Sequence, residues 1–440
     1  MLKKVGLLMC VFCLAFIDEV KAEAFAIEEF FLDNGMQVIV IENHKAPIVK
    51  HMVFYKTGAV DEPRGKGGIA HLLEHLMFRG TKKVKDKEFN KIMEQNGAES
   101  NAFTSQDVTA YHQFLDISRL ELAMFLEADR MKNLKISDEA FEVERDIVFQ
   151  ERKQRVDNNP AAKFYEMVQK ALWGNHPYGN PVTGLDDEIK NLTKQDALEF
   201  YKKYYSPNNA VLVLSGDIKL DEARFLAEKY YGKLKPVKLE KSIIEPLPEN
   251  LDVKLKTKLK EVKLPRLVKI MAVPSFVQDK TKAYAIDILA NYLSQDENSP
   301  LYQKLVAKDK KALSVYVGYD GISRSLGSFS LSVIPQALPD DEFEKSVDKA
   351  WYYAIKKLDE KELEKTKKKM LSAQVYLKDN PASLAQIAGW MAASGVSVDE
   401  LQNYEENIKR ISLNDVLDMA DFVWNKAPKA TGILYATEDN

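Results

Sequence analysis

Hydrophobic and polar positions alternate in the early part of the chain and then change to a helical period. Residues 36–41 and 48–55 are rich in β-branched and aromatic side chains and predict two strands joined by a turn. Over 69–78 the apolar residues recur every three to four positions, which predicts a helix that ends before Gly80. Residues 100–114 predict an extended segment. The first part of the chain therefore mixes strands and helices.

The rest of the chain repeats these two patterns. The predicted helices are 118–130, 138–156 and 280–293, and the predicted strands are 210–214, 267–273, 312–319, 328–333 and 431–435. The strands at 210–214 and 431–435 each end a half of the chain, and each closely follows a proline, Pro207 or Pro428. This internal similarity indicates a duplicated α+β unit.

Between the two halves the composition changes. From Lys233 to Pro265, prolines stand among many Lys and Glu residues, with few large apolar side chains. Such a composition is typical of a linker between domains. We therefore expect a first domain at 23–235, a linker at 236–262 and a second domain at 263–440.

The overall composition narrows the class of protein. The 440 residues are 45% hydrophobic and 29% charged, which suits folded domains rather than disorder or a bundle of membrane helices. A formal net charge of −3 lacks the basic excess of a nucleic-acid-binding protein, so we expect no nucleic-acid partner. Two cysteines cannot supply a disulfide framework or a cysteine-rich zinc site. A bound metal would therefore rest on histidine and carboxylate.

The N-terminus has the layout of a secretory signal peptide. Two lysines precede an apolar run at 5–17, and residues 20–22 (Val-Lys-Ala) suit a cleavage site. The apolar run is shorter than the roughly 20 residues that cross a bilayer. We expect residues 1–22 to be removed and the mature chain to be exported without a membrane span, to the periplasm. The alternative is an uncleaved anchor or a buried first strand.

The strongest chemical signal is a pair of histidines in the predicted helix 69–78. His71 and His75 are four residues apart, so they share one helix face and both imidazoles can reach one metal ion. Glu74 follows His71 by three residues and shares that side, where it can hold a water beside the metal. The competing interpretation is a pair of surface or core histidines on an amphipathic helix.

A catalytic zinc also needs a third protein ligand and an open position for water. The predicted helix 138–156 offers Glu144 and Glu151, which are seven residues apart and project from one face. One of them would ligate the metal while the other orients a ligand. A glutamate-rich helix with a solvated face is the alternative.

These residues and their surroundings resemble a known family. Residues 71–75 read His-Leu-Leu-Glu-His, the inverted zinc motif H-x-x-E-H. With Gly-Gly-Ile-Ala at 67–70 and Leu-Met-Phe-Arg-Gly-Thr at 76–81, this stretch resembles the pitrilysin and mitochondrial processing peptidase family, in its bacterial exported type. Residues 205–217 resemble the end of that family's first domain. The likeness extends over nearly the whole mature chain.

The resemblance implies roles for the candidate residues. One zinc ion per chain would be held by His71, His75 and Glu151. Glu144 matches the family's supporting glutamate. Glu74 would be the general base that takes a proton from a zinc-bound water. The implied function is a zinc-dependent endopeptidase.

The resemblance also implies a fold and a mode of substrate binding. Peptides would lie extended along a sheet edge whose substrate-binding residues are Asn101, Ala102, Phe103 and Thr104. The implied fold class is α+β, with two homologous domains, each an antiparallel sheet packed with helices, forming a clamshell around a chamber. This organisation agrees with the linker placed at 236–262.

The chain departs from the family pattern in its second domain. There the family usually offers an Arg and, seven positions later, a Tyr that reach toward the scissile carbonyl. Val306 and Leu313 stand at those places, and neither can donate a hydrogen bond. We therefore expect a heterodimer in which a related zinc-free subunit supplies the Arg and the Tyr, with a homodimer as the alternative. In a further alternative, Tyr316, Tyr319 or Arg324 substitutes within the chain.

Two other functions would keep parts of the same pattern. A non-catalytic or assembly subunit of a peptidase-like complex would keep the fold, but it would have no reason to retain Glu74 beside two metal ligands. An exported zinc-binding protein would need neither this base nor a peptide-binding edge. Among the other histidines, His112 follows the substrate-edge segment, so a role at the site stays open for it, with a packed core histidine as the alternative. We expect surface or packing roles for His44, His51 and His176.

Overall fold

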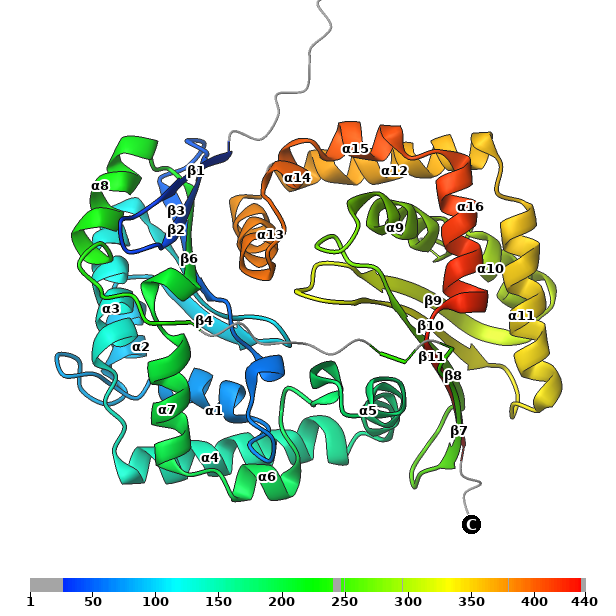
Figure 1. The fold of residues 1–440 in the computed structure, drawn as a ribbon, viewed down its shortest axis with the longest axis horizontal. Coiled ribbons are helices and arrows are strands. Elements are labelled where there is room, and N and C mark those ends of the chain that lie inside the picture. Colours follow the sequence, from blue (N-terminus) through cyan, green and yellow to red (C-terminus); the bar gives the residue numbers. More distant parts are fainter. Residues whose placement is uncertain (1–26, 240–246, 249, 295, 379, 437–440) are drawn as a thin grey trace, which may run out of the picture.

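The computed structural model describes residues 27–239, 247–248, 250–294, 296–378 and 380–436, and the predicted signal peptide lies outside them. These residues form two sheets with helices around them, side by side (Figure 1). The first sheet contains β1 (Ile27–Phe31), β2 (Gln37–Glu42), β3 (Ile48–Tyr55), β4 (Glu99–Thr104), β5 (Thr109–Asp116) and β6 (Ala210–Gly216). The second contains β7 (Asp252–Lys258), β8 (Arg266–Val273), β9 (Ala312–Asp320), β10 (Gly327–Pro335) and β11 (Lys429–Tyr435).

Helices occupy most of the connections, in agreement with the predicted α+β class. The first half of the chain, 27–239, contains α1 (Ile69–Leu76), α2 (Glu88–Gln95), α3 (Leu120–Asn133), α4 (Asp138–Arg152), α5 (Pro160–Trp173), α6 (Asp186–Lys190), α7 (Lys194–Tyr204) and α8 (Leu220–Tyr230). The second half, 247–436, contains α9 (Lys280–Ser294), α10 (Pro300–Tyr302), α11 (Asp341–Lys356), α12 (Glu360–Lys378), α13 (Pro381–Ser394), α14 (Asp399–Gln402), α15 (Tyr404–Arg410) and α16 (Leu413–Asp421).

The two sheets share one topology. Their strand orders are β1-β2-β6-β3-β5-β4 and β7-β11-β8-β10-β9, which match strand for strand once β1 is set aside. The sheets are mainly antiparallel, as predicted, and each also contains one parallel pair, β2 with β6 and β7 with β11. A strand inserted between two antiparallel strands must run parallel to one of them. The shared order supports the duplicated unit inferred from the sequence.

The strands and helices predicted from periodicity are present, with small shifts at their ends. The extended segment 100–114 corresponds to β4 and β5 with a turn between them. Strand β7 lies inside the stretch 236–262 that the composition predicts to be a linker, so the linker prediction is wrong for these residues. Every second residue of β7 is exposed, and several of these are lysines. An exposed edge strand of this kind has the same polar composition as a linker.

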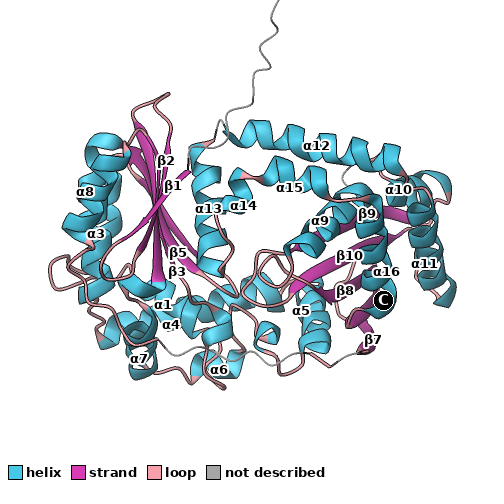
Figure 2. Ribbon diagram, turned by 45° about the horizontal axis from the view of Figure 1, so that its top comes forward, coloured by secondary structure: helices cyan, strands magenta, loops and turns pink. Residues whose placement is uncertain are grey.

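Each half covers one face of the other half's sheet. Helix α13 of the second half packs on β6 and β3, and α5 of the first half packs on β11 and β8 (Figure 2). The helices lie very close to the strands. A Cβ on Gly389 would lie 2.1 Å from the Phe54 ring, and one on Gly432 would lie 2.4 Å from Val168. Because each sheet is apolar on both faces, the two halves complete each other's cores.

A buried ion-pair network also joins the halves. The turn between β9 and β10 reaches the first half, where Arg324 Nη2 lies 2.7 Å from Asp61 Oδ2 and Arg324 Nε lies 3.0 Å from Asp107 Oδ1. The Tyr178 hydroxyl donates to Asp107 and accepts the Ser325 backbone N–H at 3.1 Å. These contacts fix the turn against the first half.

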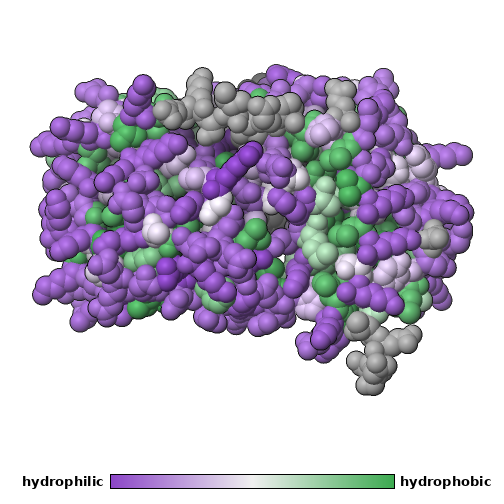
Figure 3. Space-filling model, turned by 60° about the horizontal axis from the view of Figure 1, so that its bottom comes forward, coloured by the Kyte–Doolittle hydropathy of each residue, from purple (hydrophilic) through white to green (hydrophobic). Residues whose placement is uncertain are grey.

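One face of the outer surface is mainly polar (Figure 3). The face drawn in Figure 3 is largely hydrophilic and carries a hydrophobic band to the right of its centre. Among the described residues, none of the helices combines the length and the apolar character that crossing a bilayer requires.

Candidate metal centre and peptide-binding edge

Helix α1 carries the H-x-x-E-H motif, and a carboxylate fixes its N-terminus. Gly68, just before the helix, has a φ of +84°, and a Cβ there would lie 3.0 Å from the Thr183 carbonyl oxygen. The buried Glu62 carboxylate accepts the N–H groups of Gly68 and Ala70, each at 3.0 Å. The three leucines of the helix are fully buried in the core. The remaining face, with the two histidines and the glutamate, is therefore held toward a cavity.

The three predicted metal ligands converge. His71 Nε2 lies 3.7 Å from Glu151 Oε2, and His75 Nε2 lies 3.9 Å from Glu151 Oε1. One ligand atom from each of the three residues lies within 4.8 Å of the other two. Tetrahedral ligands at zinc–ligand distances near 2.1 Å stand roughly 3.4 Å apart, so small side-chain movements would close this site on a zinc ion.

The chemistry of these donors also fits a cation. Burial lowers the pKa of His71 to about 3, so its imidazole is neutral and can ligate. Within the part of the chain that the structure describes, the buried Glu151 Oε2 accepts no hydrogen bond, although Arg155 Nη2 lies 3.2 Å away. Two imidazoles and one carboxylate are a ligand set that zinc commonly takes in catalytic sites.

Glu144 supports this site from behind His75. His75 Nδ1 donates to Glu144 Oε2 at 3.0 Å, and Arg79 Nη1 donates to Glu144 Oε1 at 3.2 Å. Burial alone would lower the pKa of His75, but the hydrogen bond with Glu144, together with the charges of Glu151 and Glu74, raises it overall. The contact fixes the ring orientation and leaves Nε2 for a metal, which is the supporting role that the resemblance implies for Glu144.

Glu74 stands beside the ligands without joining them. Its Oε2 accepts the Thr104 hydroxyl at 2.6 Å, which ties helix α1 to strand β4. Burial raises the pKa of Glu74 from its usual value, which brings the carboxylate closer to a base that works near neutral pH. Thr104 therefore orients Glu74, in addition to its predicted place on the substrate edge.

All nine predicted site residues surround one cavity of about 460 Å³. They are His71, Glu74, His75, Asn101, Ala102, Phe103, Thr104, Glu144 and Glu151. Strand β4 is the last strand of its sheet and pairs with β5 on one side, so among the described residues its other backbone edge faces the cavity unpaired. The arrangement combines a metal-binding constellation, a carboxylate base and an open strand edge.

Sequence reasoning missed two cations at this site. Arg79 follows His75 by four residues, and Arg155 follows Glu151 by four residues, so each lies one helical turn beyond a ligand. This spacing is the signal that would have found them. The prediction considered only groups that bind metal or move protons, and these arginines instead neutralise the carboxylates around the ligands.

The other histidines lie away from the cavity. His51 is buried between Gln113 and Tyr231, and the exposed His44 pairs with Asp217. His112 accepts Lys50 Nζ at 2.7 Å on the opposite side of the sheet from the metal site. These contacts are structural.

The residues proposed as internal substitutes for the missing Arg and Tyr have other partners. The Tyr319 hydroxyl donates to the Pro274 carbonyl at 2.6 Å, and Arg324 is held by its two aspartates. Tyr316 is 63% exposed on the edge strand β9. Val306 packs partly buried against the second core, and Leu313 is 47% exposed.

Comparison with known proteins identifies two matching family models. One, described as Insulinase (Peptidase family M16), matches residues 37–186, and the other, described as Peptidase M16 inactive domain, matches residues 191–370. The first model covers every residue of the candidate metal centre. The second covers most of the half in which no such centre was predicted.

Curated relatives carry peptidase names. The chain is 34% identical to the zinc protease PqqE of Helicobacter pylori over 292 residues. These residues make up 65% of this chain and 65% of that protein. It is 31% identical to the probable mitochondrial-processing peptidase subunit beta of Schizosaccharomyces pombe over 205 residues. These residues make up 47% of this chain and 45% of that protein. The matched region thus spans less than two thirds of either relative.

Solved structures match over more of the chain. A protease from Helicobacter pylori superposes with a TM-score of 0.85 at 27% identity, over 93% of this chain and 99% of that one. The first half of the periplasmic protease PqqL from Escherichia coli gives 0.77 at 19% identity, over 93% and 92%. The second likeness shows the fold alone. Both agree with a chain made of two α+β units.

Proposed function

Since the chain belongs to the M16 family of peptidases, we propose that it is a zinc-dependent endopeptidase that cuts peptides bound in extended form along β4. The observation that carries this proposal is the single cavity that joins His71, His75 and Glu151 to Glu74 and to an open strand edge. A purely structural zinc site would be closed by a fourth ligand and would need no base.

The residues around the cavity would have separate roles in the reaction. His71, His75 and Glu151 would hold zinc, which when bound makes a water acidic and polarises a carbonyl. The Thr104 hydroxyl occupies Glu74 Oε2, which leaves Oε1 to take the proton of the attacking water and to pass it to the leaving amine. Glu144 keeps the His75 ring in the orientation that presents Nε2.

Strand β4 would bind the substrate backbone. A peptide that adds a strand to this edge forms main-chain hydrogen bonds that do not depend on its sequence. Phe103 and Asn101 line the same cavity, where they would contact substrate side chains. This mode of binding requires an unfolded segment, since a folded substrate offers no free strand at the catalytic residues.

We also propose that a related zinc-free subunit completes the site with an Arg and a Tyr, and that a homodimer is the alternative. The support is chemical. The side chains of Val306 and Leu313 have no hydrogen-bond donor, and the side chains of Tyr319 and Arg324 already have partners in this chain. Export to the periplasm after removal of residues 1–22 belongs to the same proposal, on the basis of the N-terminal sequence. The two-domain division belongs to it too, with the second domain beginning near Asp252.

The test is cleavage of an unstructured fluorogenic peptide by the purified chain. We expect one zinc per chain. We expect slow cleavage by the chain alone and faster cleavage with the related subunit, both of which a chelator stops and added zinc restores. Cleavage that survives full removal of metal would overturn the zinc mechanism. An ordinary rate without any second chain would overturn the partner proposal. Stoichiometric zinc with no cleavage, alone or with the related subunit, would identify a non-catalytic subunit instead.

A further inference from the structure

Arg155 differs from the other charged groups that line the metal-site cavity. Of the described residues in that lining, it is the one Lys or Arg, beside the three carboxylates of Glu74, Glu144 and Glu151. Its side chain is 62% exposed, so solvent reaches most of it. A peptide held along β4, which lines the same cavity, therefore meets one exposed cation close to the candidate metal ligands.

The guanidinium of Arg155 keeps most of its hydrogen-bonding capacity. Among the described residues its partner is Glu151, whose Oε2 lies 3.2 Å from Arg155 Nη2 but accepts no hydrogen bond. A metal ion bound to Glu151 would compete for the same carboxylate charge and weaken this ion pair. Since a guanidinium has five N–H donors in a planar fork, Arg155 can bind a further carboxylate through two parallel hydrogen bonds.

Arg79, the other arginine beside the metal ligands, lacks this capacity. Its side chain is only 9% exposed. Nη1 of Arg79 donates to Glu144 Oε1 at 3.2 Å, and its Nε lies 3.1 Å from Asp86 Oδ1. This guanidinium is enclosed between two carboxylates of the chain, so it supports the fold around His75, whereas Arg155 is open to a ligand.

The backbone that carries Arg155 is anchored. Residues Lys153–Asp157 form a π-helical turn directly after α4, and such turns are frequent at functional sites. Arg152, the last residue of α4, donates to the Glu166 carboxylate of α5 at 2.8 and 2.9 Å. This bidentate pair ties the start of the turn to α5. The exposed side chain of Arg155 therefore extends into the cavity from a fixed backbone position.

We propose that Arg155 binds a carboxylate of the peptide whose backbone lies along β4. An acidic side chain and the C-terminus of a short peptide both present this group. The proposal rests on the peptidase function proposed above and names a substrate class for it. Because residues 101–104 and Arg155 line one cavity, a carboxylate near the bound segment reaches the guanidinium without leaving that cavity. Arg155 would thus be a specificity-determining residue of the half that holds the metal ligands.

The test measures binding rather than cleavage. Zinc-loaded Glu74→Gln protein is titrated with labelled, end-blocked peptides in which a single glutamate is moved along an otherwise neutral sequence, and each is compared with its glutamine counterpart. A second set, shortened residue by residue, compares a free C-terminus with an amidated one. We expect at least about a fivefold affinity advantage for the carboxylate at one position in one of the sets, the size of a partly exposed charge-assisted contact.

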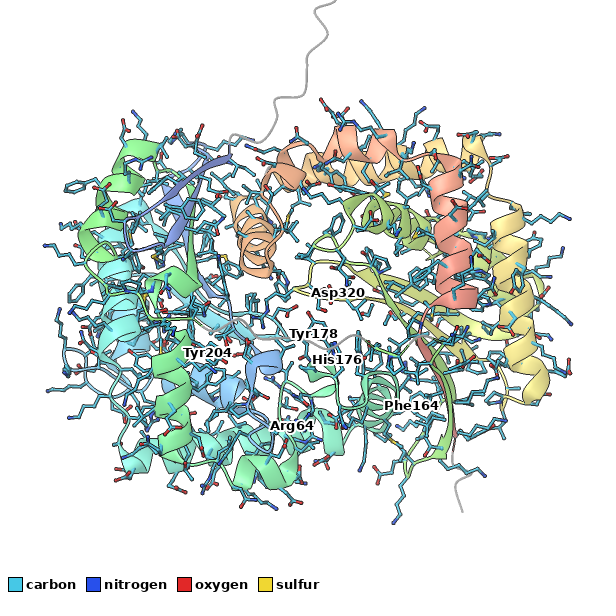
Figure 4. All side chains as sticks on the ribbon, viewed as in Figure 1. Arg64, Phe164, His176, Tyr178, Tyr204 and Asp320 are labelled. Atoms are coloured by element: carbon cyan, nitrogen blue, oxygen red, sulfur yellow. The ribbon has the colours of Figure 1, made fainter. Side chains whose placement is uncertain are left out.

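Variants in the same Glu74→Gln background then assign the advantage to Arg155. With Arg155→Gln it should fall to within about twofold, while the neutral peptides still bind, which also shows that the variant is folded. Arg155→Lys should keep part of the advantage, because it keeps the charge without the planar fork. The control is Arg64→Gln, which removes an exposed arginine outside this cavity (Figure 4) and should leave the advantage unchanged.

Two results would overturn the proposal: equal affinities within every pair of peptides, or a carboxylate advantage that survives Arg155→Gln. Because each advantage compares two peptides on one protein, a uniform change in affinity through zinc does not alter it. Neither result bears on catalysis, since neutral peptides can still be cleaved. Conversely, a chain that binds carboxylates through Arg155 and cleaves nothing would keep the subsite and remove the peptidase function.

Discussion

Once β1 is set aside, the two halves of the molecule have the same strand order, but the α-helices that follow β3 and its counterpart β8 are very different. In the first half that helix is α1, with two histidines and a glutamate facing a cavity. In the second half it is α9, which has no histidine and is buried along most of its length. Its partly buried Asp287 accepts a hydrogen bond from Asn291. The duplicated scaffold thus has candidate metal ligands on this helix in one copy and core-packing side chains on it in the other.

The half without ligands still shapes the site. Trp390 of α13 stacks on Phe103 of β4, with ring centroids 5.4 Å apart, and Arg324 pairs with Asp61 and Asp107 of the first half. The edge strand that would bind substrate is therefore braced by the opposite half. The comparison separates residues that should change chemistry when replaced from residues that should change stability.

The largest effect should follow from the ligands of the first half. His71→Ala removes one of three donors, so we expect loss of stoichiometric zinc and of all measurable cleavage, with little loss of folding. Metal content by mass spectrometry and cleavage of an unstructured peptide are the measurements. The control is His44→Ala, which changes an exposed histidine and should alter neither. Retained zinc in His71→Ala would contradict the ligand set.

Breaking the contact between the halves should cost stability. Arg324→Met removes the guanidinium that contacts Asp61 and Asp107, whose side chains are 2% and 5% exposed. We expect a loss of about 3 kcal/mol in the free energy of unfolding, measured by denaturant titration. Arg410→Met is the matched control, since its pair with Glu406 is 73% and 68% exposed and worth at most about 0.5 kcal/mol. Equal losses would show that the halves do not depend on Arg324.

Weakening the support of a ligand should have a smaller effect than removing it. Glu144→Gln keeps an acceptor for His75 but removes the charge, so we expect roughly a 10- to 100-fold loss in zinc affinity or in kcat/KM. Glu139→Gln changes an exposed glutamate of the same helix and serves as the control. A Glu144→Gln protein that cleaves at the full rate and binds zinc as tightly would remove Glu144 from the site.

The smallest effect should come from Asp287 in the second half. Burial raises the pKa of Asp287 to about 6, above its ordinary value of 3.8 in an unfolded chain. Folding therefore disfavours the charged form, a cost that is absent below about pH 4 and complete above about pH 6. Asp287→Asn should be more stable than the native protein by about 1 to 2 kcal/mol at pH 8 and equal to it at pH 4.

Denaturant titrations of both proteins at pH 4 and pH 8 measure this difference in the free energy of unfolding. The cleavage rate is the internal control, since Asp287 lies away from the first half's cavity. A variant that is less stable than the native protein at pH 8 would show that the aspartate charge is stabilised in the fold. A changed cleavage rate would contradict the separation of the two halves.

Much of the candidate metal site was predictable because its residues follow helical spacing. The positions of His71, Glu74 and His75 fix a face once the helix is recognised, and Glu144 and Glu151 repeat two turns apart. The repeated pattern of apolar runs also indicated that one α+β unit occurs twice in the chain. Local periodicity is therefore sufficient for the residues that share one element.

Contacts between distant elements were beyond such reasoning. The apolar faces of α5 and α13 predict burial, but not that each helix packs on the sheet of the other half. Strand β7 was not predicted from the sequence, because its lysines are as typical of a linker as of an exposed edge strand. The pairing of Arg324 with Asp61 and Asp107 joins residues more than 200 positions apart, and no spacing in the chain announces it.

The most direct test of the central claim is zinc content and cleavage measured together on Glu74→Gln. The claim is that Glu74 moves the proton while His71, His75 and Glu151 hold the metal. It predicts one zinc per chain, as in the native protein, and a rate of peptide cleavage lower by about 10²- to 10⁴-fold. A variant that keeps its zinc and cleaves at the native rate would contradict the account.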